Sequence, residues 1–179
     1  MSSTILLIGI AKVVFGLIVA VVGILSASRL ISVLLGLANV ERSLARGNLA
    51  IAILESGAIL SLALLCRHSV SATFVAMDFL YQGADFSPAM LPAFLGYALV
   101  HVGAALALGA VGVAIGVTAY GALTRRIDEL QEASEGNPAP ALIIAAIMVA
   151  IAILTAPGLE TLLDGLLPMP EFIDVEHGG

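Results

Sequence analysis

The chain has 179 residues, of which 60% are apolar and only 11% charged, and its formal net charge is −6. About a quarter of the residues in a soluble domain are charged, so this composition excludes a water-soluble globular protein and predicts a membrane protein. The acidic balance, with no basic stripe to meet phosphates, also excludes a nucleic-acid partner.

Four apolar segments are each long enough to cross a bilayer core, which takes roughly 20 residues. They cover residues 5–27, 49–66, 93–123 and 138–156. These segments lack the in-out alternation of a membrane β-barrel, and an open sheet edge is not stable in lipid. We therefore expect an all-α, polytopic membrane protein in a lipid bilayer, with four transmembrane helices and short interfacial helices.

The first apolar segment differs from a signal peptide. It has no basic n-region, and Lys12 interrupts its apolar run. We expect this segment to be a helix of the mature protein.

A short motif occurs twice in the chain, 89 residues apart. GNLAIA begins at Gly47 and GNPAPA begins at Gly136, each at the start of an apolar segment. At the same offset Gly23 corresponds to Gly112. This recurrence predicts two parallel two-helix repeats, related by a pseudo-two-fold axis along the membrane normal. The expected parts are a first repeat, 1–66, an external interfacial segment, 67–92, a second repeat, 93–156, and an amphipathic acidic tail, 157–179.

The repeated Gly-Asn pairs have a structural explanation. Glycine allows the chain to turn sharply, and the asparagine side chain can cap helix amides that lipid would leave unsatisfied. Pro138 follows the second pair and suits the first helical position, where no amide partner is needed. We expect turn and cap roles, not ligand binding, for Gly47, Asn48, Gly136 and Asn137.

The predicted chain has four spans, and a Gly-Asn-x-Ala-x-Ala motif opens the second helix of each two-helix unit. In this arrangement it resembles the DUF350 family of small bacterial membrane proteins. The resemblance covers nearly the whole chain and ends in PGLETLLDGLLPMP. It implies an inner-membrane location and no catalytic residues, because the family has no assigned function. Pro140 stands where the first motif has Ile51, a departure that affects where the fourth helix begins.

Two further segments have apolar residues at helical spacing. Val70, Phe74, Met77 and Tyr81 predict a short helix that lies flat on the bilayer. In the tail, an apolar face made by Leu159, Leu162 and Leu163 predicts a helix packed on the protein itself or on a partner.

Glycines recur along two of the predicted spans and indicate close helix packing. The two seams consist of Gly9, Gly16 and Gly23 on the first span and Gly109, Gly112 and Gly116 on the third. One seam can be used inside the subunit, so the other predicts a homo-oligomer.

Three ionisable residues lie inside the apolar spans: Lys12, Glu55 and His101. Such groups are costly in lipid and face the bundle or a water-filled path. Lys12 and His101 are 89 residues apart and therefore occupy corresponding positions at one depth, with Glu55 as the expected counter-charge of Lys12. Alternatively, Lys12 extends to the headgroups, His101 is a packing residue and Glu55 is a neutral buried carboxyl.

Orientation follows from the arginines. Arg29, Arg42 and Arg46 lie at the first loop and Arg125 and Arg126 in the third, against Arg67 on the opposite side. The positive-inside rule predicts cytoplasmic first and third loops and both termini outside.

Two classes of function fit these features. The first is a homo-oligomeric bundle with a proton or small-ion pathway at Lys12, Glu55 and His101. The alternative is a non-conducting scaffold or adaptor that docks partner proteins through its cytoplasmic loops or external tail. We expect no enzyme, cofactor or metal site, because no catalytic spacing is present and the histidines, His68, His101 and His177, are scattered along the chain.

Overall fold

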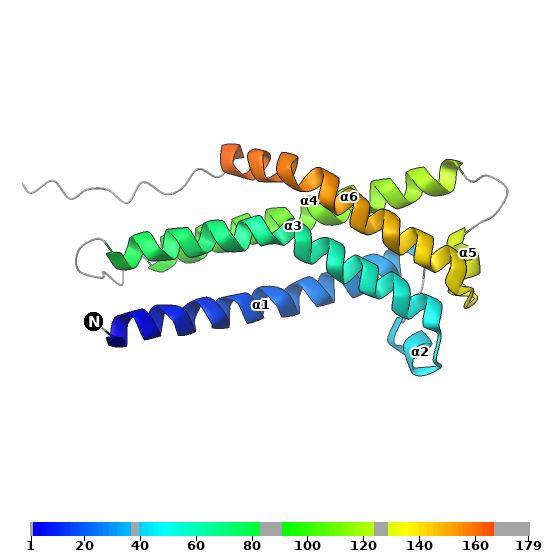
Figure 1. The fold of residues 1–179 in the computed structure, drawn as a ribbon, viewed down its shortest axis with the longest axis horizontal. Coiled ribbons are helices and arrows are strands. Elements are labelled where there is room, and N and C mark those ends of the chain that lie inside the picture. The colour runs from blue at the N-terminus through cyan, green and yellow to red at the C-terminus, as the bar shows by residue number, and fades with distance from the viewer. Residues whose placement is uncertain (1, 37–39, 83–90, 124–128, 167–179) are drawn as a thin grey trace, which may run out of the picture.

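The computed structural model describes residues 2–36, 40–82, 91–123 and 129–166, and these residues form a bundle of four long helices with two short ones (Figure 1). The long helices are α1 (Ser2–Leu34), α3 (Leu49–Gln82), α4 (Leu91–Leu123) and α6 (Pro138–Leu166). The short helices, α2 (Val40–Ala45) and α5 (Glu129–Ser134), lie near each other at one end of the bundle. We call this end the loop end, and the opposite end, where α1 begins and α6 ends, the N-terminal end.

Each long helix contains a segment that is long and apolar enough to cross a membrane. These candidate spans are Gly9–Leu34, Leu49–Asp78, Leu95–Ala122 and Pro138–Gly165. The prediction of an all-α, multi-pass membrane protein is therefore confirmed for the described residues. The helices contain 29 to 34 residues and are about 44 to 51 Å long, so they exceed a hydrocarbon core of about 30 Å.

The helix boundaries repeat with the offset of the sequence motif. Helix α4 begins and ends 89 residues after α1, and α5 begins and ends 89 residues after α2. Helix α6 begins 89 residues after α3. This agreement supports a two-unit repeat, while the pseudo-two-fold axis stays a prediction.

The two Gly-Asn pairs form matching turns at the loop end. Gly47 and Gly136 have φ angles of 77° and 107°, which only glycine adopts readily. In the first turn Asn48 N donates to Ser43 O at 3.1 Å and Gly47 N to Leu44 O at 2.8 Å, the hydrogen-bond pattern of a Schellman motif.

The asparagines of these turns cap the helices that follow. Asn48 Oδ1 accepts from Ile51 N, and Asn137 Oδ1 accepts from Ala139 N. Asn48 Nδ2 also donates to Ser134 O at 3.2 Å and so links one turn to the other.

Helix α3 continues without interruption past residue 66, where the sequence analysis ended the second span. Residues 67–82 therefore extend this helix and do not form a separate helix flat on the bilayer. The reason is packing: Met77 is buried, and Phe74 meets Phe15 of α1 edge to face, with ring centroids 6.1 Å apart. Residues 83–90 of the expected interfacial segment lie outside the described residues, and side chains from Phe79 onward in α3 are not described.

Helix α6 likewise continues through Pro157 to Leu166. The expected apolar face of the tail packs on the protein itself, because Leu159 and Leu163 are buried, although Leu162 is 46% exposed. The remainder of the expected tail, 167–179, lies outside the described residues.

The closest helix approach is the crossing of α3 and α6, which is built on small residues. A Cβ added to Gly57 would lie 2.7 Å from Ala145 Cβ and 2.8 Å from Ala145 Cα. Gly57 is therefore required at this crossing, and neither predicted glycine seam includes it. Leu54, Met148 and Ile144 are buried around the contact.

The two predicted glycine seams differ in packing. Gly109 lies against Leu65 of α3, and a Cβ on Gly116 would overlap the Ile151 side chain of α6. In contrast, no atom lies within 4 Å of a Cβ added to any of the remaining seam glycines, Gly9, Gly16, Gly23 and Gly112. The seam on α1 is therefore not used within the described part of the subunit.

Candidate functional site

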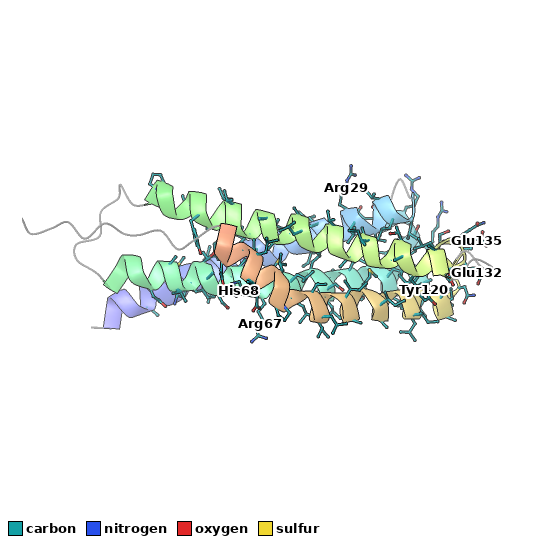
Figure 2. All side chains as sticks on the ribbon, turned by 90° about the horizontal axis from the view of Figure 1, so that it is seen from above. Arg29, Arg67, His68, Tyr120, Glu132 and Glu135 are labelled. Atoms are coloured by element: carbon teal, nitrogen blue, oxygen red, sulfur yellow. The ribbon has the colours of Figure 1, made fainter. Side chains whose placement is uncertain are left out.

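Three chemically active side chains from three different helices meet in the N-terminal half of the bundle. His68 of α3 points its Nε2 toward Asp164 of α6, 2.9 Å from Oδ1. The ring of His101 on α4 lies beside that of His68, with centroids 6.2 Å apart. One ligand atom from each of the three residues lies within 4.8 Å of the other two. Figure 2 shows His68 beside the end of α6.

His101 is the most unusual residue of this cluster. It is fully buried, and neither Nδ1 nor Nε2 has a hydrogen-bond partner among the described residues. Buried polar groups are nearly always satisfied, so an orphaned imidazole indicates a function or a missing partner. The neighbouring Tyr97 ring, 5.2 Å away between centroids, covers His101 without an observed hydrogen bond to it.

The packing of the surrounding helices explains why these side chains converge. Ser69 is buried next to His68, and its hydroxyl donates to the backbone carbonyl of His101 at 3.3 Å, which ties α3 to α4 at this level. On α6 the buried Leu163 anchors the helix, and the adjacent Asp164 is thereby held at the cluster. Arg67 is turned away from His68 and is exposed (Figure 2).

A second carboxylate accompanies the cluster on α6. Glu160 Oε1 lies 3.9 Å from His68 Nδ1, so the two nitrogens of His68 each face an acidic side chain. The exposed side-chain fractions rise outward, from 25% for His68 to 47% for Glu160 and 60% for Asp164. The cluster thus leads from the buried His101 to the surface of the bundle.

The depth of the cluster follows from the helix geometry. A hydrocarbon core of about 30 Å takes about 20 helical residues. Counted from the starts of α3 and α6 at the loop end, the core ends near Ser69 and Gly158. With the core placed from these starts, His68 would lie at its boundary and Asp164 beyond it, although the candidate spans Leu49–Asp78 and Pro138–Gly165 include both residues.

Lys12, the first of the predicted intramembrane residues, forms an ion pair with Asp78. Its Nζ lies 2.6 Å from Asp78 Oδ1 and 5.5 Å from the centroid of the Phe74 ring. The side chains of Lys12 and Asp78 are 25% and 39% exposed. Asp78 lies in the part of α3 beyond residue 66, where the second span was predicted to end. For this reason Asp78 was not considered as a partner of Lys12.

Glu55, the second predicted residue, has a different partner. Its Oε1 accepts a hydrogen bond from the Ser28 hydroxyl of α1. Along α3, 23 residues or about 35 Å separate Glu55 from Asp78. The predicted pairing of Lys12 with Glu55 is therefore wrong, because the two residues lie toward opposite ends of the bundle.

Most of this site is not evident from the sequence. His101 stands out because it lies in an apolar span, but the histidines are scattered along the chain, and no sequence pattern singled out His68, Asp164 or Glu160. The structure brings His68 and His101 together, whereas His177 lies outside the described residues. A useful signal was present in the tail, where Glu160 and Asp164 are four residues apart and share a helix face.

Comparison with known proteins identifies the second half of the chain. Residues 89–169 match the model of the family described as Domain of Unknown Function (DUF350). This range contains α4, α5 and α6, and therefore His101, Glu160 and Asp164. No curated protein and no solved structure matches the chain.

Proposed function

We propose that this chain is a membrane protein that takes up small cations at the cluster of His68, His101 and Asp164, the cations being either protons or metal ions. The chain belongs to the DUF350 family. The observation that carries this proposal is the buried His101, whose two ring nitrogens lack a partner among the described residues. An imidazole can accept a cation at a free nitrogen, and an ionisable group inside an apolar bundle is energetically costly.

The surroundings of His101 favour positive ligands. Asp164 and Glu160 supply two carboxylates within 4 Å of His68, and Asp164 is the more exposed of the two. Negative groups at the mouth of a site raise the local concentration of cations. A cation would first meet these carboxylates, then His68 and finally His101.

Lys12 and Glu55 have structural roles in this proposal. Each has a local partner, Asp78 and Ser28 respectively, that reduces the cost of placing it in an apolar helix. An ion pathway was expected at Lys12, Glu55 and His101. Of these residues only His101 keeps that role in the proposal, and its partners are now His68 and Asp164.

Passage across the membrane requires more than one subunit in this proposal. Between Glu55 and His68 the buried side chains of α3 are Ala58, Ser61, Leu62, Leu65 and Cys66. Among these side chains only the Ser61 hydroxyl and the Cys66 thiol could bind a cation, so this stretch offers few ligands. The remaining half of a path would have to lie between subunits.

The packing of α1 supports such an assembly. Only 11% of the span of α1 is buried, compared with 50% for α3. Gly16 and Gly23 line a groove of about 420 Å³ between α1 and α3, and a Cβ on either would have no neighbour within 4 Å. A helix of a second subunit would fit this groove better than lipid chains, because small residues let backbones approach closely.

The location and orientation are part of the proposal. The resemblance to the DUF350 family implies a bacterial inner membrane, and the arginine distribution favours an orientation with the loop end in the cytoplasm and both termini outside. The cation cluster would then open toward the external side. A reporter fused to the C-terminus should be active only on the external side, and cytoplasmic activity would reverse the direction of uptake.

Flux through proteoliposomes tests the proposed function. The wild-type protein should carry protons or small cations faster than protein-free vesicles, and His101→Gln should abolish the difference. Glu55→Gln, at the opposite end of α3, is the matched control and should retain flux. If the folded wild-type protein carries neither protons nor cations, the scaffold or adaptor function replaces this one.

That alternative has its own structural support at the loop end. Glu132 and Glu135 lie there (Figure 2), where the two turns are joined by the Asn48–Ser134 hydrogen bond. A rigid acidic end of this kind suits a docking surface for a partner protein.

A further inference from the structure

We propose that His68, His101 and Asp164 form a binding site for a divalent transition-metal ion of the zinc class, with Glu160 as a positioning residue. This inference rests on the proposed function, since it names the cation that the cluster takes up. It concerns equilibrium binding, whereas the proposed function concerns movement across the membrane.

The first argument is geometric. The three ligand atoms lie within 4.8 Å of one another. Zinc bonds of about 2.1 Å in a tetrahedral arrangement place ligand atoms about 3.4 Å apart. Rotation of the partly exposed His68 and Asp164 side chains toward the buried His101 would have to close this difference.

The second argument is the state of His101, which is independent of the distances. The residue is fully buried, one of its nitrogens belongs to the set of converging atoms, and neither nitrogen is bonded to a described residue. An unsatisfied buried polar group is unfavourable. A metal ion would satisfy one nitrogen and so give the burial of His101 a function.

The third argument is ligand chemistry. Two imidazoles and one carboxylate suit zinc and related ions, whereas calcium and magnesium prefer shells made of oxygen atoms. Three protein ligands leave one position of a tetrahedron for water or for an exchanging ligand. Such an open site favours uptake and release over permanent structural binding.

Glu160 completes the arrangement. A histidine that binds a metal through one nitrogen commonly donates the N–H of the other to a carboxylate, which sets its tautomer and orientation. His68 directs Nε2 to Asp164 and has Glu160 3.9 Å from Nδ1. Glu160 therefore acts through His68 and is not itself a ligand.

The test is a metal titration of the full-length protein. The protein is purified in detergent without a polyhistidine tag, stripped with a chelator, and titrated with Zn²⁺ against a chromogenic indicator. We expect one equivalent per chain, and titration with Co²⁺ should produce the visible absorption bands of a tetrahedral site. Mg²⁺ should not compete.

Four variants locate the ion. His101→Gln and Asp164→Asn should each lower the affinity at least tenfold, and Glu160→Gln should lower it about 10- to 100-fold without changing the stoichiometry. Glu135→Gln removes an exposed carboxylate at the loop end and should bind like the wild type. Asp164→Asn keeps the test valid even where His101→Gln fails to fold, because Asp164 is 60% exposed.

The outcomes are distinct. The inference is overturned if the folded wild-type protein binds no Zn²⁺ at 100-fold molar excess, or if Asp164→Asn and His101→Gln bind as tightly as the wild type. Zinc binding without cation flux in vesicles would uphold the metal site and reject the proposed transport. Proton flux without zinc binding would reject the metal site and uphold the proposed transport.

Discussion

The helices of the two halves begin at corresponding positions, but the two halves differ at corresponding polar positions. Lys12 of α1 and His101 of α4 are 89 residues apart. Lys12 is partly exposed and paired with Asp78, whereas His101 is fully buried with both nitrogens unbonded to described residues. The first half thus carries a paired charge at this position, and the second half carries a buried imidazole without a hydrogen-bond partner among the described residues.

At a second pair of corresponding positions, the first half has polar residues and the second half has apolar ones. In the first half Ser28 of α1 and Glu55 of α3 share a hydrogen bond. Their counterparts in the second half, Val117 and Ile144, are buried and apolar. The comparison teaches that polar side chains of this bundle find a partner, either on an adjacent helix, as Glu55 does, or in the backbone of their own helix, as Ser61 does. Both ring nitrogens of His101 lack a partner among the described residues, and this exception is the basis of the proposed function.

The largest expected effect concerns the packing of α4 against α6 within the second half. Gly116→Leu should destabilise the bundle by about 1–3 kcal/mol or more, because the new side chain would overlap Ile151. Gly112→Leu, one turn away and open, is the control and should have little effect. Thermal unfolding in detergent measures both, and equal losses would mean that the open face is covered by another chain.

The same logic separates the two glycine seams. Gly16→Leu should leave the subunit folded, because no atom lies within 4 Å of the added Cβ. It should convert a homo-oligomer to smaller species, as measured by light scattering in detergent. A wild-type protein that is monomeric at every concentration would remove the assembly from the proposal.

The next effect tests the contrast between His101 and Lys12 directly. His101→Leu should raise the free energy of unfolding of the metal-free protein by about 1–3 kcal/mol, because a buried unsatisfied polar group is removed. Lys12→Leu should lower it, because Asp78 loses its partner. Denaturant titration decides, and destabilisation by both changes would contradict a functional cost at His101.

A smaller effect distinguishes the partners of Lys12. In a double-mutant cycle, Lys12→Met and Asp78→Asn should show a coupling of about 0.5–1 kcal/mol, since the pair is partly exposed. Lys12→Met and Glu55→Gln should be additive within about 0.5 kcal/mol. Coupling of Lys12 to Glu55 instead would restore the pairing that the sequence suggested.

The smallest expected effect comes from giving the first half the residues of the second. Ser28→Val combined with Glu55→Ile should be nearly neutral, because replacing both partners of a hydrogen bond by apolar groups leaves no group unsatisfied. Glu55→Ile alone leaves the Ser28 hydroxyl without its acceptor. This single variant is therefore the control. A large loss in the double variant would show that Glu55 has a role beyond this bond.

Some features of the site could be read from the sequence, and others could not. His101 was recognisable because an ionisable residue in a long apolar span is rare, whatever its contacts. Asp78 and Asp164 were not, because the spans were ended too early, at residues 66 and 156. Length alone cannot tell where an apolar helix leaves the membrane, since helices continue beyond it wherever their residues still pack.

The pairing of residues was the other limit. The expected pairing of Lys12 with Glu55 requires the second span to end near residue 66, so that no nearer carboxylate follows on the same helix. Once α3 extends to Gln82, a nearer carboxylate is available at Asp78. Likewise, His68 and His101 are 33 positions apart and meet only because α3 and α4 are antiparallel and tied by Ser69.

The fixed offset between the two motifs predicts a two-unit repeat. By itself the sequence determined the class of the protein and its four long apolar helices, because apolar length and composition are properties of the chain. It also determined the two turns, since Gly47 and Gly136 are required by local backbone geometry. Only the tertiary structure decided which glycines pack and which carboxylate serves each basic group. These are contacts between helices, and they depend on the rotation and length of each helix, which no local pattern specifies.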